Sequence, residues 1–182
     1  MLVAQKCVDR KEDLRQSLIR SGVIGMQGTL APLDSRAKRS RMAEFQRLCR
    51  EQGIPLTTQR RTILNTVLAH DCHPTADEVC AASAVRKARI SRATVYRTLE
   101  SLVRMGVITK ACHPGGAVRY DGRTEIHHHL VCLRCDAVID IADARLDTIP
   151  IPDTSALGFD VKDFRVQLRG FCRRCRRSED KR

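Results

Sequence analysis

The sequence contains no tryptophan, and aromatic residues make up only 3% of its 182 residues. A hydrophobic core must therefore be mainly aliphatic, and hydrophobic residues at 42% of the chain supply enough side chains for one. No apolar run approaches the roughly 20 residues that a membrane-spanning helix needs. Charged residues also interrupt the first 25 residues, which the apolar core of a signal peptide does not tolerate. We expect neither a membrane protein nor an exported one, and a cytoplasmic location.

Positive charge is what the sequence has in excess. It has 33 Lys and Arg against 21 Asp and Glu, a formal net charge of +12, and a pI near 9.7. Such an excess is typical of proteins that bind a polyanion, most often nucleic acid. A solvated basic surface gives the same composition, so charge alone favours nucleic-acid binding without establishing it.

Residues 42–122 have the periodicity of several helices followed by a hairpin. The pattern predicts a first helix from Met42 to about Gly53 and a second that Thr57 or Thr58 caps. A third helix begins with a Thr75–Glu78 capping box, and a fourth runs from Ser91 to Gly106. Two strands follow, at Val107–Lys110 and Val118–Tyr120. Helices followed by a two-stranded wing are the layout of a winged helix-turn-helix. We therefore expect a DNA-binding domain here.

The fourth predicted helix is the candidate recognition helix. Val95, Leu99 and Leu102 form its buried stripe, which leaves Arg92 and Tyr96 outside to face bases and phosphates. An exposed helix face without a partner is the plain alternative. Residues 1–41 read as a partly disordered basic extension, with a possible helix at Lys11–Ile19 and a basic run at residues 36–41, or as an extension without function.

Two cysteine pairs are the sharpest feature of the sequence. Cys132 and Cys135 form one CxxC motif, and Cys172 and Cys175 form another after 36 intervening residues. Four thiolates in a reducing compartment are the ligands of a closed structural zinc site. Two thioredoxin-like redox motifs would need a βαβ context that the sequence does not have. The other cysteines, Cys7, Cys49, Cys72, Cys80 and Cys112, are expected to be packing residues or spectators.

A second group of metal-ligand residues surrounds three consecutive histidines. On a strand, His127 and His129 share one face and the intervening His128 lies on the other. Asp121 precedes them and Asp140 follows on the next predicted strand. Imidazoles with carboxylates suit a borderline divalent ion such as Fe(II), Mn(II) or Zn(II). A solvated strand end is the alternative for this pattern.

These features together resemble the ferric uptake regulator (Fur) superfamily of bacterial metal-dependent repressors. The matching stretches are Thr57–Arg60, His73–Glu78, Ser91–Arg97, Arg119–Asp121, His127–Cys135 and Gly170–Cys175. The resemblance covers about residues 43–176. It implies an α/β (α+β) protein: a winged-helix DNA-binding domain at 42–122, a C-terminal dimerisation and metal-binding domain at 123–178, and a tail at 179–182.

The resemblance also implies the site residues and partners. The regulatory metal, Fe(II) or Mn(II), would be held by His73, Asp121, His127, His129 and Asp140, and the structural Zn(II) by the four CxxC cysteines. Double-stranded operator DNA would be contacted by Gln59, Arg60, Ser91, Arg92, Thr94, Tyr96 and Arg97. A metal that joins ligands on both sides of a hinge near Gly122 would fix the homodimer at the spacing of DNA half-sites.

Departures from the family pattern sharpen the expectation. Iron sensors typically have Glu where this chain has Asp121 and Asp140, whereas two Asp are the set of peroxide-sensing members, in which bound Fe(II) and peroxide oxidise a ligand histidine. Ile126, His128 and Asp163-Phe164 replace residues of a further metal site, so we expect two metals per chain. Pro150 and Pro152 predict a dimer-domain helix that is short or displaced to Asp153–Leu157.

The leading hypothesis is therefore a repressor, not an enzyme, that senses peroxide or iron. An iron- or haem-responsive regulator without peroxide sensing is the second reading. A zinc hydrolase that uses the histidines is a remote third, because it would need an open metal position, a general base and a substrate pocket, and no catalytic motif in the sequence supports it.

Overall fold

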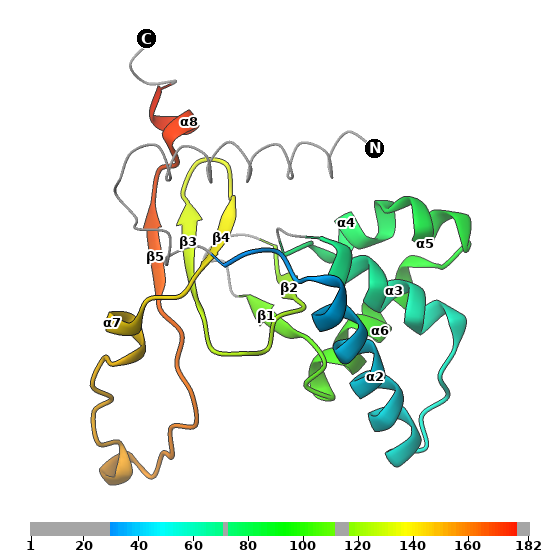
Figure 1. The fold of residues 1–182 in the computed structure, drawn as a ribbon, viewed down its shortest axis with the longest axis horizontal. Helices are drawn as coiled ribbons and strands as arrows, with labels where there is room; N and C mark the ends of the chain where they lie inside the picture. Colours follow the sequence, from blue (N-terminus) through cyan, green and yellow to red (C-terminus); the bar gives the residue numbers. More distant parts are fainter. Residues whose placement is uncertain (1–29, 71–72, 112–116, 178–182) are drawn as a thin grey trace. The chain divides into compact units, whose positions relative to one another are not determined.

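The computed structural model describes residues 30–70, 73–111 and 117–177. The described residues divide into two compact units, which we call the N-terminal unit (residues 31–124) and the C-terminal unit (Leu30 with residues 125–177) (Figure 1). Outside the described residues lie the possible helix at Lys11–Ile19 and the cysteines Cys7, Cys72 and Cys112. Within the described part, no helix is long and apolar enough to cross a membrane.

The N-terminal unit contains a series of capped helices. They are α2 (Ser35–Glu51), α3 (Thr58–Ala69), α4 (Ala76–Ala81), α5 (Ser83–Lys87) and α6 (Arg92–Arg104). The side chains of Thr57, Thr75 and Ser91 accept backbone hydrogen bonds at the starts of α3, α4 and α6, which confirms these predicted caps. The predicted capping box is present too, since the backbone N–H of Thr75 donates to Glu78 at 2.8 Å.

Helix α2 begins earlier than the sequence pattern indicates. Its N-cap is Asp34, whose carboxylate accepts from the backbone N–H of Ala37 at 2.7 Å. The basic run from Arg36 to Arg41 is therefore the first part of this helix, whereas the pattern placed it in an extension ahead of a helix starting at Met42. The pattern was misleading because the run has no apolar stripe of its own, and an aspartate cap determines where the helix starts.

The helices pack around an aliphatic core that matches the predicted stripes. Side chains that are at most 2% exposed in this core are Phe45, Cys49, Ile63, Leu64, Val67, Leu68, Val79, Val85, Val95, Leu99, Leu102, Val107 and Ile108. Phe45 is the only Phe among them. Val, Leu and Ile therefore supply most of the core, in agreement with the scarcity of aromatic residues.

A two-stranded antiparallel wing follows α6. Its strands are β1 (Thr109–Ala111) and β2 (Arg119–Asp121), with Lys110 opposite Tyr120. The chain leaves α6 through Gly106 at φ +69°, a left-handed conformation that glycine adopts at little cost. Strand β2 also contacts the segment before α4, because the backbone N–H of Tyr120 donates to the carbonyl of Pro74 at 2.9 Å. The wing thereby fixes the segment that begins at His73.

The C-terminal unit is built on a three-stranded sheet. Its order is β4-β3-β5, with β3 (His128–Cys132) in the centre, β4 (Val138–Ile141) antiparallel to it and β5 (Gln167–Gly170) parallel to it. The short helix α8 (Arg173–Arg177) follows β5. A central strand has its backbone groups bonded on both sides, so the histidines and cysteine that β3 carries are held rigidly.

The connection from β4 to β5 carries little regular structure. It contains α7 (Ala144–Asp147), one helical turn, and η1 (Ser155–Leu157), a 3-10 turn. The expected dimer-domain helix is thus reduced to the short α7, and the turn η1 lies within the predicted displaced position, Asp153–Leu157. Pro150 and Pro152 lie between the two and lack the N–H groups that a continuing helix would need.

Candidate metal centres and nucleic-acid surface

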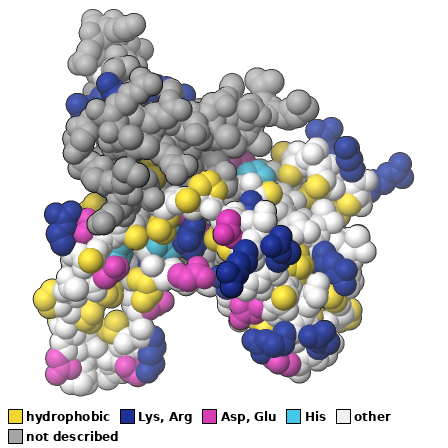
Figure 2. All heavy atoms as spheres, viewed as in Figure 1, with side chains coloured by type: hydrophobic (Ala, Val, Ile, Leu, Met, Phe, Trp, Pro, Cys, Tyr) yellow, Lys and Arg dark blue, Asp and Glu magenta, His cyan; other side chains and the backbone are white. Residues whose placement is uncertain are grey.

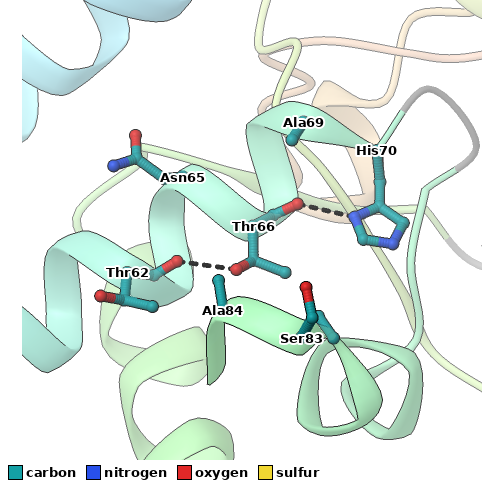
Figure 3. Close-up of a pocket in the computed structure, with 8 residues that line it drawn as sticks. Thr62, Asn65, Thr66, Ala69, His70, Ser83 and Ala84 are labelled. Atoms are coloured by element: carbon teal, nitrogen blue, oxygen red, sulfur yellow. Dashed lines mark hydrogen bonds between the residues drawn. The ribbon is translucent and has the colours of Figure 1, made fainter. Parts of the chain in front are cut away.

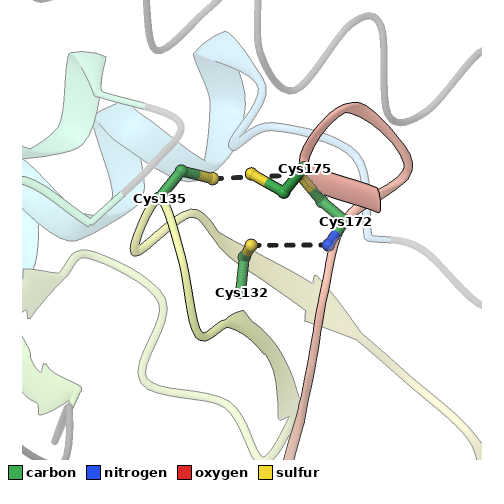
Figure 4. A group of neighbouring side chains, drawn as sticks. All are labelled: Cys132, Cys135, Cys172 and Cys175. Carbon is green, nitrogen blue, oxygen red and sulfur yellow. Dashed lines mark hydrogen bonds between the residues drawn. The ribbon is translucent and has the colours of Figure 1, made fainter. Parts of the chain in front are cut away.

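The four cysteines of the CxxC pairs converge at one end of the sheet in the C-terminal unit. Cys132 ends β3, Cys135 lies in the turn before β4, and Cys172 and Cys175 follow β5 (Figure 4). All four sulfur atoms lie within 4.8 Å of one another, and the Sγ atoms of Cys135 and Cys172 are 3.8 Å apart. In a tetrahedral zinc site each sulfur lies about 2.3 Å from the ion, which places the sulfurs roughly as far apart as the Sγ atoms of Cys135 and Cys172 are here. The cluster fits a structural zinc ion.

The thiols of this cluster differ in their acidity. Burial raises the pKa of Cys132, but backbone N–H groups of Cys172, Arg134 and Cys135 that point at its sulfur outweigh burial and lower it to about 6. Burial and hydrogen bonds to the neighbouring thiols raise the pKa of Cys175 to about 12. Zinc binds the thiolate form of cysteine, so metal binding at this cluster releases protons.

Arginines support the same cluster. The Nη1 of Arg134 donates to the backbone carbonyl of Cys175 at 2.5 Å, and its guanidinium lies 5.5 Å from the centre of the Phe171 ring. This bond ties the first CxxC turn to the second. Positive charge beside four thiolates also offsets their net negative charge around a divalent ion.

Within the N-terminal unit, the structure brings two of the expected regulatory ligands together. The Nε2 of His73 lies 3.2 Å from the Oδ2 of Asp121, and both side chains are buried. The other oxygen of Asp121 accepts from the backbone N–H of Arg123 at 2.7 Å. An imidazole and a carboxylate held this close are donors that a borderline divalent ion accepts.

The backbone at His73 is strained and held in place by β2. His73 has φ +49°, a left-handed conformation that costs a non-glycine residue on the order of 1–3 kcal/mol. Arg119 on β2 donates to the His73 carbonyl at 3.0 Å and also pairs with Glu78 at 3.4 Å. Because Asp121 lies on the same strand as Arg119, one strand determines the positions of both candidate ligands.

Within the C-terminal unit, the sheet groups the other three expected ligands. The rings of His127 and His129 lie edge to face with centres 4.7 Å apart, which confirms that they share one side of the chain. The Nε2 of His129 is 4.0 Å from the Oδ1 of Asp140, its partner across the β3–β4 pairing. The Nδ1 of His127 donates to the Glu125 carbonyl at 2.7 Å, so its Nε2 carries the lone pair that a metal ion needs.

His128 faces the opposite side of β3, as the alternation predicts. Its side chain is fully buried, its Nδ1 accepts from the backbone N–H of Val166 at 3.0 Å, and its Nε2 donates to Asp147 at 3.0 Å. The ring also faces Phe164 at 6.1 Å. Both ring nitrogens of His128 therefore form hydrogen bonds. A metal ion would need a lone pair on one of them, so we assign His128 to hydrogen bonding rather than to metal binding.

We expect two bound metal ions per chain. The cysteine cluster accounts for zinc and the His/Asp residues for one more divalent ion, whereas the environment of His128 offers none. Elemental analysis of protein reconstituted with Zn(II) and excess Mn(II), then desalted, should give one equivalent of each. A second equivalent of tightly bound manganese would contradict the assignment of His128 to hydrogen bonding. His128→Asn should leave the ratio unchanged.

The face of α6 that the sequence predicts to bind DNA is exposed. Ser91, Arg92, Tyr96 and Arg97 are all exposed, and Thr94 is partly so. Ser91 has a second role as the cap of α6, and its hydroxyl lies 2.9 Å from that of Thr94. On the face that Figure 2 shows, Lys and Arg side chains lie in several separate places rather than in one patch. Local geometry, more than the number of charges, must therefore define the DNA-reading surface.

The other expected DNA contacts lie at the start of α3. Gln59 is exposed and Arg60 is half-buried. The Nη1 of Arg60 donates to the carbonyl of Pro55 at 2.6 Å, which closes the turn between α2 and α3. Arg60 therefore has a structural role in addition to the one predicted for it.

Sequence reasoning missed Asp77, an exposed residue in the first turn of α4. Its Oδ1 accepts hydrogen bonds from Arg92 at 2.6 Å and from Tyr96 at 2.9 Å. Asp77 is 15 and 19 residues from these partners, so only the packing of α4 against α6 reveals the contact. No local pattern in the sequence could have identified it.

A separate pocket lies between α3 and α5, lined by Thr62, Asn65, Thr66, Ala69, His70, Ala82, Ser83 and Ala84 (Figure 3). The Thr66 hydroxyl donates to the Thr62 carbonyl at 2.8 Å, and the Nδ1 of His70 donates to the Thr66 carbonyl at 2.7 Å. These lining groups stabilise α3, and the pocket gathers no set of side chains aimed at a ligand.

Two described cysteines lie outside the zinc cluster. Cys49 is buried in the core, where burial raises its thiol pKa, and Cys80 is half-buried with a pKa that burial also raises. A raised thiol pKa lowers reactivity, because the thiolate is the reactive form. Both agree with the expectation that they are packing residues or spectators.

Comparisons with known proteins place these features in a family. Residues 51–169 match the Ferric uptake regulator family. The peroxide-responsive repressor PerR of Staphylococcus aureus (strain Mu50) is 31% identical over 126 residues, which are 69% of this chain and 85% of that protein.

Solved structures have the same fold. The Helicobacter pylori ferric uptake regulator Fur aligns with a TM-score of 0.63 and 18% identity, over 81% of this chain and 97% of its own. The Campylobacter jejuni peroxide stress regulator aligns with a TM-score of 0.54 and 26% identity, over 71% of this chain and 97% of its own. The fold class predicted from the sequence is confirmed.

Proposed function

This chain belongs to the ferric uptake regulator family, and on that premise we propose that it is a metal-dependent transcriptional repressor that binds operator DNA as a homodimer. The winged-helix order of elements, the exposed Arg92, Tyr96 and Arg97 on α6 and the net charge of +12 support DNA binding. The relatives named above are regulators rather than enzymes. In this assignment the C-terminal unit supplies the dimer contact and the structural zinc.

The regulatory ion in this proposal is held by ligands from both units. His73 and Asp121 come from the N-terminal unit, and His127, His129 and Asp140 from the C-terminal unit. The set contains three imidazoles and two carboxylates, and nearly all of them are buried. Fe(II) and Mn(II) bind such nitrogen and oxygen donors, whereas the structural zinc site consists of four thiolates.

Shared ligands explain how the metal would control DNA binding. An ion that contacts all five residues binds best when the two units are in one particular arrangement, and it therefore shifts the population towards that arrangement. If that arrangement sets the two recognition helices of a dimer at the spacing of DNA half-sites, metal and operator stabilise each other's binding.

Peroxide is the signal that the residues favour. Both carboxylates of the proposed set are aspartates, and the S. aureus relative is named a peroxide-responsive repressor. Fe(II) supplies the reducing chemistry towards peroxide when it is bound there. A ligand imidazole of His73, His127 or His129 would take up one oxygen atom of the peroxide while the other leaves as water. Loss of a neutral imidazole donor would then weaken metal binding and release the operator.

The test is mass spectrometry of the full-length protein after oxidation. We expect anaerobically purified protein loaded with Fe(II) and treated with a small excess of hydrogen peroxide to gain one oxygen atom on His73, His127 or His129. Protein loaded with Mn(II) should gain none, because Mn(II) does not reduce peroxide in this way. His70 and His128 serve as internal controls and should be unmodified in both samples.

Unmodified histidines in both samples would favour the second reading. The chain would then be a sensor of iron supply or haem, and the two aspartates would have no bearing on peroxide. Loss of operator binding on iron chelation, with no effect of peroxide, would give the same conclusion independently.

A further inference from the structure

One carboxylate links two side chains of the candidate recognition helix. The Nη2 of Arg92 and the hydroxyl of Tyr96 both donate to the Oδ1 of Asp77, at 2.6 and 2.9 Å. Arg92 and Tyr96 are four residues apart on α6 and so lie on one face, one turn apart. The hydrogen bond to Asp77 also raises the pKa of Tyr96 above its usual value.

Stability does not account for this arrangement. The side chains of Arg92 and Asp77 are 69% and 64% exposed. Ion pairs at such exposure contribute little to the free energy of unfolding, because solvent screens the charges and ordering two side chains costs entropy. A negative charge on a surface expected to approach phosphates also weakens attraction to DNA. Neither the stability of the fold nor attraction to DNA therefore accounts for the hydrogen bonds that Asp77 accepts.

We propose that Asp77 is a positioning residue for operator recognition, which favours one arrangement of Arg92 and Tyr96 on the face of α6 that reads base pairs. This inference rests on the proposed function, because it assumes that α6 enters the major groove. A side chain that already favours its bound conformation loses less conformational entropy on binding DNA than a freely rotating one.

The hydrogen-bonding capacity of the two side chains supports this assignment. Arg92 uses one guanidinium N–H group to bond Asp77 and has four more. These are enough for a bidentate contact to the O6 and N7 atoms of a guanine. Tyr96 donates its only hydroxyl proton to Asp77, so towards DNA its oxygen can only accept, for example from an amino group of cytosine or adenine. Asp77 thereby gives each side chain one defined role.

Removing Asp77 separates positioning from charge, because the two effects have opposite signs. Loss of a negative charge should strengthen binding to all DNA, whereas loss of positioning should reduce discrimination at the base pair that Arg92 reads. The matched control is Glu51→Ala, which also removes one negative charge and an exposed ion pair, between Arg47 and Glu51 at 2.8 Å on α2.

The experiment begins with the metal-loaded wild-type protein. A preferred operator is selected from a pool of random duplex DNA, and affinities are then measured for it and for duplexes with single base-pair changes. The pair read by Arg92 is the one at which Arg92→Ala loses discrimination. At that pair we expect Asp77→Ala to lose discrimination severalfold, which is less than Arg92→Ala loses, because the contact itself remains possible. Glu51→Ala should retain discrimination at every pair.

The double variant shows whether Asp77 acts through Arg92. Asp77→Ala combined with Arg92→Ala should discriminate no worse at that pair than Arg92→Ala alone. Unchanged or improved discrimination in Asp77→Ala would overturn the inference. Asp77→Leu, of similar size but without an acceptor oxygen, provides a second test if the thermal unfolding of the alanine variant differs from wild type. If the wild-type protein selects no sequence at all, the proposed function fails, and that result is distinct from a failure of Asp77.

Discussion

Replacing Cys132 with serine is expected to remove zinc from the protein and unfold the C-terminal unit while the N-terminal unit stays folded. The sheet of the C-terminal unit buries few apolar side chains, chiefly Val131, Val138 and Ile141. A core this small rarely stabilises a domain without a metal or another cross-link. Zinc binding contributes roughly 10–16 kcal/mol to small zinc-finger peptides, so losing one thiolate should exceed what this sheet supplies. Zinc content and circular dichroism on heating measure both effects.

Cys132 is the most informative of the four positions. Backbone hydrogen bonds lower its thiol pKa to about 6, and it lies at the end of the central strand, so its loss affects metal binding and the sheet together. Cys80→Ser is the matched control, because Cys80 is a half-buried thiol of the N-terminal unit. It should retain one equivalent of zinc and the wild-type melting curve. A Cys132→Ser variant with full zinc content and an unchanged melting temperature would show that the cluster is not the structural site.

Features that depend on nearby residues could be predicted from the sequence. The caps Thr75 and Ser91 act on residues three positions away, and the turn at Gly106 depends on one backbone conformation. The opposite orientations of His127 and His128 follow from strand alternation alone. The cysteine pairs are identifiable because two CxxC motifs are the ligand spacing of four-thiolate zinc sites.

Features that depend on distant residues could not be predicted. Asp77 finds Arg92 only because α4 packs on α6, and the single-turn helix α5 has too few residues for a hydrophobic period to show. The pairing of His128 with Val166 and Asp147 depends on how the long β4–β5 connection returns to β3. In each case tertiary contacts select one conformation among several that the local sequence permits.

Substituting a candidate regulatory ligand in either unit is expected to abolish metal-stimulated operator binding to the same extent. Asp121→Ala removes a ligand of the N-terminal unit, and His129→Ala removes one of the C-terminal unit. If one ion joins the two, each variant loses the coupling between metal and DNA, which should lower operator affinity at saturating Mn(II) by up to roughly 100-fold. Fluorescence anisotropy with a labelled operator, with Mn(II) or with chelator, measures that coupling directly.

Matched controls separate this effect from general damage. His70→Asn removes an imidazole of the N-terminal unit outside the proposed site, and Asp160→Ala removes an exposed carboxylate of the C-terminal unit. Both should keep the wild-type response to Mn(II), and all four variants should retain their structural zinc.

Unequal effects of the two ligand variants would be decisive against a shared ion. If His129→Ala abolished the response to Mn(II) while Asp121→Ala preserved it, the C-terminal unit alone would hold the metal. The ion could then influence DNA binding only through the dimer contact, and the strained left-handed backbone of His73 would need another explanation. Equal losses would instead support one ion that needs ligands from both units, because each variant would then remove the same coupling between metal and DNA.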